Sequence, residues 1–381
     1  MLRTPRQYVA GATAGLLLSA VVSLPATPAA AATVPQFATT SGLLGFANGT
    51  LEFVNVLNLP ATDVARVGLG QSAAGVQLPG LGAAATRDQL KQPLLIASKA
   101  GKTAYGHASG ANVGLADAET AEPNVIEDTL IEATSPAPSS AKGNLVGVAV
   151  SPVVRAEVLP SSAVANTTGN TACVTGKDIS RGVASVANAD ALILSPAPAG
   201  TGLVSVKDTS QSTSREALIA QTNAAGAVVG ANAGLLSQTT QNLAPITLFG
   251  GTPAQLVIKV LAPIQLSAAA GGLPGTALVR YGTTQTDPTK PILDINGTKV
   301  NSNQVFGNGG FKIGLGVADI TIGTPAHSLT GLENTQPTQA ANGTTASAAA
   351  DFIRISVPGR LPTPATNPLD GPLAPLNGPL N

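Results

Sequence analysis

The chain has 381 residues, a length that predicts two or three domains. Its 20 Lys and Arg residues balance its 20 Asp and Glu residues, which argues against a nucleic-acid binder, because such proteins need clustered cations. With no Trp, 3 Tyr and 7 Phe, the chain has too few aromatic side chains to stack on sugars or bases. Composition therefore excludes several ligand classes without naming a reaction.

The first 32 residues are predicted to be an export signal. Arg3 and Arg6 supply a positive start, and Val9 to Leu24 is an uncharged, mostly apolar run that is shorter than the ~20 residues of a membrane helix. The small residues Ala29 to Ala32 fit a cleavage site, so the mature chain is expected to begin near Ala32 or Thr33. We expect the signal to be helical and expect no membrane span after its removal, which leaves 18 cations against 20 anions.

Along the mature chain, the hydrophobic pattern predicts strands. Leu51 to Leu59 alternates apolar and polar residues, and Asn48-Gly49 before it is predicted to form a hairpin turn. One short helix is expected at Thr86 to Leu90, where Thr86 and Gln89 have the spacing of a capping box. The Val- and Thr-rich stretches 182–194 and 201–234 favour strands.

Three further strand signals follow toward the C-terminus. Leu256 to Leu261 is β-rich and is closed by Pro263. Ile292 to Ile295, the pair Asn296-Gly297 and Thr298 to Val300 predict a hairpin. Phe352 to Val357 alternates strictly, with Ile353, Ile355 and Val357 on one face.

These signals predict a mainly β fold of antiparallel, sandwich-like sheets, with an N-terminal signal helix and a disordered Pro-rich tail. Proline-rich connectors at 135–138 and 195–198 interrupt the chain, and the tail from Pro358 holds seven prolines. We therefore predict a signal peptide at 1–32, a β-rich region at 33–198, a second at 199–357 and a flexible tail at 358–381. A single large sheet domain is the alternative to two β regions.

Histidine chemistry is limited to His107 and His327. His107, Ser109 and Asp117 are close in sequence and contain the residue types of a catalytic triad, but no serine lies in the Gly-x-Ser-x-Gly pattern of a nucleophile elbow. A polar residue on a strand edge or loop is the alternative explanation for His107. We expect no catalytic residue here.

An acidic segment runs from Asp117 to Glu132, with six carboxylates and no Lys or Arg. Oxygen-rich clusters hold calcium, but the spacing matches no EF-hand, and a solvated loop explains the segment equally well. Cys173 is the only cysteine, so an intramolecular disulfide is excluded, and with only two histidines a zinc or iron site is not expected. We expect no metal-ligating or cofactor-binding residue, and no cofactor.

Several stretches resemble secreted, β-rich cell-envelope proteins of high-GC Gram-positive bacteria, a family without assigned activity. They are the Ala-rich leader, Asp178 to Ala184, Gly234 to Thr239, and Ala244 to Pro253. The resemblance implies an exported surface or cell-wall-associated protein, with a cell-envelope component or another surface protein as its partner. It implies no site residue.

Three functional hypotheses remain open from the sequence. The first is a non-enzymatic structural or adhesive surface protein, because the low charge and the Ser/Thr-rich composition suit sheet packing and weak surface contact. The second is an extracellular binding module for a small apolar or lipidic ligand, which requires a large dry pocket. The third is a hydrolase that uses His107 or the acidic segment, which requires a serine, an imidazole and a carboxylate to converge.

Overall fold

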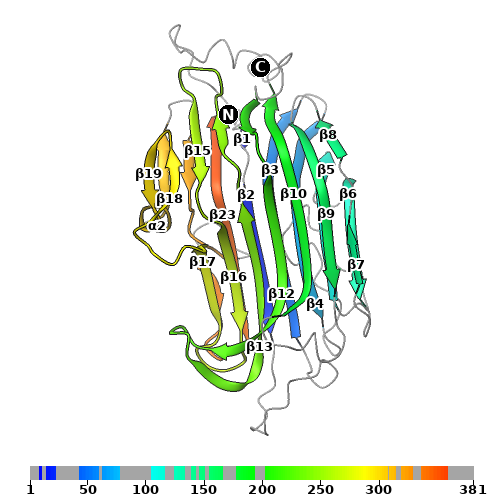
Figure 1. The fold of residues 1–381 in the computed structure, drawn as a ribbon, viewed down its shortest axis with the longest axis vertical. Helices are drawn as coiled ribbons and strands as arrows, with labels where there is room; N and C mark the ends of the chain where they lie inside the picture. The colour runs from blue at the N-terminus through cyan, green and yellow to red at the C-terminus, as the bar shows by residue number, and fades with distance from the viewer. Residues whose placement is uncertain are drawn as a thin grey trace, which may run out of the picture.

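The computed structural model is mainly β and forms two antiparallel sheets that face each other (Figure 1). It describes residues 8–10, 14–22, 43–59, 62–77, 104–115, 124–133, 139–142, 146–150, 154–165, 177–193, 202–307, 309–314, 319–328 and 336–358. Long strands run along the long axis of the molecule, and α2 (Ser302–Phe306) is the one helix among these residues. The predicted mainly β, antiparallel class is confirmed.

Sheet A combines strands from both ends of the chain. In spatial order it contains β20 (Phe311–Gly314), β21 (Asp319–Ile322), β23 (Thr345–Pro358), β1 (Tyr8–Ala10), β3 (Leu43–Leu59), β4 (Thr62–Gln77), β5 (Ala104–Leu115) and β6 (Asn124–Ala133). The strand β2 (Ala14–Val22) pairs with β23 and β3, and β22 (Thr338–Gln339) pairs with β23. Sheet A is therefore continuous only when the N-terminal strands β1 and β2 lie between β23 and β3.

Sheet B is formed by the middle of the chain. In spatial order it contains β17 (Leu278–Thr283), β16 (Ile264–Ala270), β13 (Val228–Asn242), β12 (Ser210–Thr222), β10 (Asp178–Ile193), β11 (Gly202–Val206), β14 (Ile246–Leu248), β15 (Leu256–Val260), β18 (Pro291–Ile295) and β19 (Thr298–Asn301). The strand β9 (Val154–Ala165) pairs with β10, β7 (Ser139–Lys142) and β8 (Val146–Val150). Because β12 pairs with the first half of β10 and β11 with the second, sheet B forks there.

The two sheets approach each other unusually closely in the region of β4, β5, β10 and β12. A Cβ on Gly182 would overlap the carbonyl oxygens of His107 and Ala73, and a Cβ on Gly106 would overlap backbone atoms of Val164 and Arg181. Ordinary stacked sheets lie ~10 Å apart, which leaves room for side chains from both. Here the backbones touch, so only glycine fits at these two positions.

Small hydroxyl side chains fill the next part of this interface and form a polar seam of Ser72, Ser212, Ser214 and Thr239. Ser72 Oγ lies 2.8 Å from Ser212 Oγ and 2.9 Å from Ser214 Oγ. Thr239 Oγ1 donates to the Asn48 carbonyl oxygen at 3.1 Å, and Ser214 Oγ donates to the Ser72 carbonyl oxygen at 3.0 Å. Side chains of sheet B thus bond directly to the backbone of sheet A, which satisfies polar groups that are buried from water.

Bulkier apolar side chains fill the interior on the other side of the molecule. Phe352 is fully buried, and its ring centroid lies 6.1 Å from that of Phe306, which in turn meets Tyr281 edge-on at 5.0 Å. Ile258 and Leu266 are also fully buried. This region supplies most of the large aliphatic burial, as a fold without disulfides requires.

The C-terminal strand predictions are confirmed. The segment at Leu256 forms β15, and the predicted hairpin forms β18 and β19 with Asn296 at φ 48° and Gly297 at φ 89°, as a two-residue primed turn requires. The alternating segment Phe352 to Val357 lies in β23. The helix at 86–90, Cys173 and the tail beyond Pro358 lie outside the described residues.

The predicted turn at Asn48-Gly49 is wrong, because both residues lie inside the long strand β3 and pair with Ala73 and Ser72. A Cβ on Gly49 would overlap Thr239 Cγ2 and Ser212 Oγ, so this glycine serves the close approach of the sheets instead of a turn. Asn48 is buried, and its side-chain oxygen lies within 3.4 Å of Gln71 Nε2.

Two predicted segment boundaries can be compared with the strand pairing of the structure. The boundary at 198 lies between β10 and β11, which pair with each other, so strands from both predicted regions meet in sheet B. The division into two β regions stays a prediction. The segment predicted as a signal contains β1 and β2 in this structure, and its role as a signal also stays a prediction.

We predict that Gly182→Ala destabilises the protein by about 1–3 kcal/mol, because the added methyl group must push the two sheets apart. The measurement is the urea midpoint of unfolding. The matched control is Gly282→Ala in β17, where nothing lies within 4 Å of the added Cβ. Equal midpoints for the two variants would contradict the close contact at Gly182.

Candidate functional site

The outer face of sheet B carries an open groove of ≈ 500 Å³ over β12, β13, β16 and β17. Register places its residues on one face, because Gln238 pairs with Ser267 and Ser267 pairs with Arg280. Alternate residues of β13, such as Thr239, face sheet A instead. The groove is thus the solvent side of the same strands that build the polar seam.

The groove combines an apolar base with hydrogen-bonding groups. The principal residues of its lining are Leu236, Leu278, Gln238, Gln265, Ser267 and Arg280. The amide of Gln238 accepts a hydrogen bond from Arg215, whose guanidinium also reaches Asp178 at 3.4 Å. Arg280 is exposed, and no described side chain forms an ion pair with it. Arg280 is therefore the cation that the groove presents to a ligand.

The side chains that line the groove are suited to binding a ligand and not to catalysing a reaction. As far as the described residues go, it contains no carboxylate, imidazole or thiol, so no general base faces the groove. Hydroxyl, amide and guanidinium groups along an open trough suit hydrogen bonds and one ionic contact to an extended polar chain. No signal in the sequence locates the groove, because it depends on the pairing of β16 with β13, and the pattern of a strand does not specify its neighbour.

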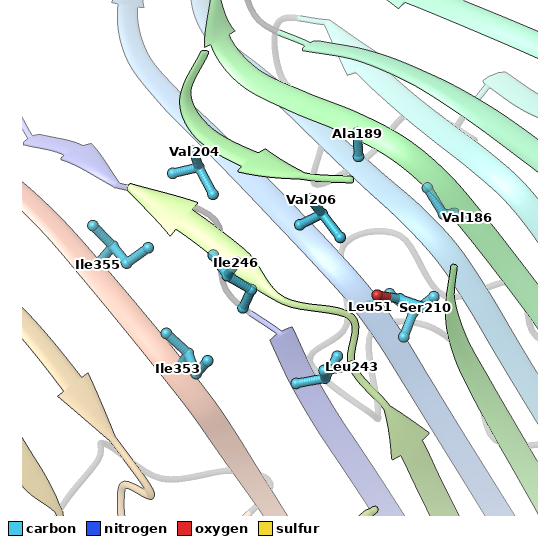
Figure 2. A pocket seen from close by; sticks show the side chains of 10 residues that line it. All are labelled: Leu51, Val186, Ala189, Val204, Val206, Ser210, Leu243, Ile246, Ile353 and Ile355. Carbon is cyan, nitrogen blue, oxygen red and sulfur yellow. The ribbon is translucent and has the colours of Figure 1, made fainter. Parts of the chain in front are cut away.

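A second, apolar cavity lies at the fork of sheet B (Figure 2). Ile353 and Ile355 reach it from β23, and Val204 and Ile246 reach it from β11 and β14. Its lining also includes Leu51, Val186, Ala189, Val206, Ser210 and Leu243. Its volume is ≈ 30 Å³, whereas an engineered cavity of ~150 Å³ is needed to hold benzene. The cavity is therefore too small for a lipid.

Glu216 is a fully buried carboxyl group between the sheets. Its Oε2 accepts a hydrogen bond from Ser237 Oγ at 2.8 Å, and its Oε1 has no hydrogen-bond partner. Burial raises the pKa of Glu216 well above its ordinary value of 4.5, although the Ser237 hydroxyl lowers the pKa in part. Because a Cβ on Gly45 would overlap Glu216 Oε2, the carboxyl is enclosed and no substrate can reach it.

The structure buries two of the three residues of the sequence-derived triad in sheet A. Because Gly106 faces sheet B, alternation along β5 turns the side chains of His107 and Ser109 to the opposite face of sheet A. His107 and Ser109 lie two residues apart in β5 and are both fully buried, while Asp117 lies outside the described residues. The backbone of His107 is in contact with sheet B at Gly182. This enclosure gives the hydrolase hypothesis no support.

His327 lies far from His107. It bridges Ala349 of β23, and its Nδ1 is 3.0 Å from the Ser328 carbonyl oxygen. Between β23 and β5 the sheet order places β2, β3 and β4, a separation of about 19 Å at ~4.8 Å per strand. The two imidazoles therefore belong to different environments.

Part of the acidic segment forms the edge strand β6, which holds Glu127, Asp128 and Glu132. An extended strand differs from the wrapped loop that surrounds calcium in an EF-hand. Within the part of the chain that the structure describes, no three His, Cys, Asp or Glu residues group as a metal site. Calcium binding by this segment remains a hypothesis.

Comparisons with known proteins give no match: no family model fits the chain, and neither a curated protein nor a solved structure resembles it. Among the described residues, the only helix is too short to span a membrane.

We predict that the stability of the full chain falls as pH rises above about 4.5, because Glu216 ionises more easily in the unfolded chain than in the folded one. While only the unfolded chain is ionised, the loss is about 1.4 kcal/mol per pH unit. In Glu216→Gln this contribution disappears, so the variant gains stability relative to the wild type as pH rises.

The measurement is the free energy of unfolding in urea from pH 4 to pH 8. Glu157→Gln, which changes an exposed carboxylate bonded to Asn188, is the control and keeps the wild-type dependence on pH. Parallel curves for the wild type and Glu216→Gln would contradict the prediction.

Proposed function

We propose that this chain is an exported, non-enzymatic surface protein that associates with the cell envelope as a structural or adhesive element. The apolar leader with its small-residue cleavage site supports export. The long, closely packed sheets support a structural role, because backbones in direct contact leave the interior little freedom to deform. The groove around Arg280 is the surface on which we expect envelope contact.

One observation carries the proposal: the described residues of the sequence-derived triad and the carboxyl of Glu216 are buried, and the binding groups of the groove are open. His107, Ser109 and Glu216 are fully buried, whereas Gln265 and Arg280 line an accessible groove. An enzyme needs its reactive groups within reach of substrate. A protein that holds on to a polar polymer needs only an accessible surface with hydrogen-bonding groups.

The alternative, a module for a small apolar or lipidic ligand, has less support. The cavity in Figure 2 has the right apolar lining, from Leu51 to Ile355, but its volume of ≈ 30 Å³ is room for about one water molecule. A lipid chain could enter only if β11 and β14 moved away from β23.

The export part of the proposal predicts where the protein is found and where it begins. Fractionation of the producing cells into medium, wall, membrane and cytosol should place it outside the cytosol. Mass spectrometry of the protein should give an N-terminus near Ala32 or Thr33. Recovery from the cytosol with Met1 retained would refute export.

The adhesive part predicts that Arg280→Ser weakens sedimentation of the protein with purified cell wall, because one unpaired cation leaves the groove. We expect a loss of about threefold to tenfold at low salt, less at high salt, where charges are screened. Lys312→Ser in β20 changes the net charge equally on the other sheet and is the control. Equal sedimentation of both variants would remove the groove from the proposal.

A further inference from the structure

The N-terminal segment occupies a strand-wide slot in sheet A. Eight residues of β2 pair with β3, from Gly15 opposite Thr50 to Val22 opposite Leu43, and β2 pairs with β23 over a similar length on its other side. The strand β1 continues the same slot, with Val9 opposite Val56 and Val357. Figure 1 shows the dark blue β2 beside the orange β23.

The width of this slot is fixed by sheet B. Thr239 of β13 bonds to the Asn48 carbonyl, which ties β3 to β13. Tyr281 of β17 donates to the Asp351 carbonyl at 3.3 Å, which ties β23 to β17. Since β16 lies between β13 and β17, the two ties are two strand spacings apart, about 9.6 Å. That distance holds β3 and β23 apart by the width of one strand.

The base of the slot is apolar. The strand β2 lies against β13 and β16. The facing residues Leu235, Leu266, Ala268 and Ala270 are fully buried with β2 in place. Removing β2 would expose this apolar surface and leave two rows of backbone N–H and C=O groups without partners, a combination that is costly for a folded sheet.

Closure of the gap by direct pairing of β3 and β23 is unfavourable. Both strands are antiparallel to β2, so they are parallel to each other, whereas the strand pairs of the described residues are antiparallel. Direct pairing would also break a tie to sheet B, either at Thr239 or at Tyr281. A new strand in the slot preserves both hydrogen bonds to sheet B, at Thr239 and at Tyr281.

We propose that the slot between β3 and β23 accepts a strand in trans from another exported polypeptide once the leader has been removed. This inference rests on the proposed export and cleavage. The occupant is an extended, uncharged, proline-free and mostly apolar segment of about nine residues, as β2 itself is.

The mature sequence offers no such segment of its own outside its strands. The stretch 33–42 contains Pro35, the tail has a proline at every second to fourth position, and 166–176 is mostly polar. In 78–103, prolines and charged residues leave no uncharged, proline-free run longer than seven residues. Proline removes a donor from the ladder and is excluded from central strands. This is why we assign the donor strand to a partner and not to a second copy of this chain.

The test refolds the mature chain, residues 33–381, from urea with and without a peptide of sequence Ala14 to Val22 carrying terminal lysines for solubility. With the peptide, we expect a higher yield of soluble protein and slow amide exchange in β3 and β23. A Leu17→Pro peptide should bind more than about tenfold less tightly, whereas a Leu17→Val peptide should bind nearly as well. The full chain, whose slot is filled, should bind the peptide weakly.

Equal yield and equal protection of β3 and β23 without the peptide would overturn the inference, because the sheet would then have closed by itself. A dimer of the mature chain that the peptide fails to dissociate would also overturn it in favour of a second copy. Neither of these results bears on whether the protein is exported. Retention of Met1 in the native protein would refute export and processing, and peptide binding by residues 33–381 would still test whether the slot accepts a strand.

Discussion

The structure depends on the direct contact between the backbones of its two sheets. At Gly106 and Gly182 no side chain fits, and around them only Ala and Ser residues are small enough. This contact explains a composition that is rich in Gly, Ala and Ser and poor in aromatic residues, since a large ring at these positions would separate the layers. Most of the largest fully buried side chains, among them Phe352, Ile258 and Leu266, lie in β14–β16 and β23.

Close contact also decides which polar groups can be buried. A hydroxyl such as Thr239 Oγ1 reaches the carbonyl of the opposite strand, so the seam satisfies buried polar atoms and fixes how the sheets align. A shift of one residue along a strand would lose these bonds and turn every side chain to the other face. Glu216 is an exception, because its Oε1 has no hydrogen-bond partner among the described residues and burial favours its protonated form.

The same constraint moves binding to the outside of the molecule. An interior without space excludes substrates, and the apolar cavity at the fork of sheet B is smaller than a lipid chain requires. The features that remain for a partner are the groove at Arg280 and, once β2 is removed, the strand position between β3 and β23. The first suits a polar polymer and the second an apolar peptide strand, so the two surfaces would serve different partners on one exported scaffold.

The sequence by itself determined the strand content, the hairpin at Asn296-Gly297 and the alternation of Phe352 to Val357, because turn chemistry and period-two patterning are local properties. It could not determine that Asn48-Gly49 lies within a strand, since the same pair suits a turn and only the contact with Thr239 and Ser212 requires glycine there. The groove, the fork and the slot were decided by tertiary structure alone, because each depends on which strands pair. In the groove β16 lies beside β13, at the fork β11 and β12 share β10, and at the slot β2 lies between β3 and β23, whose sequences are far apart.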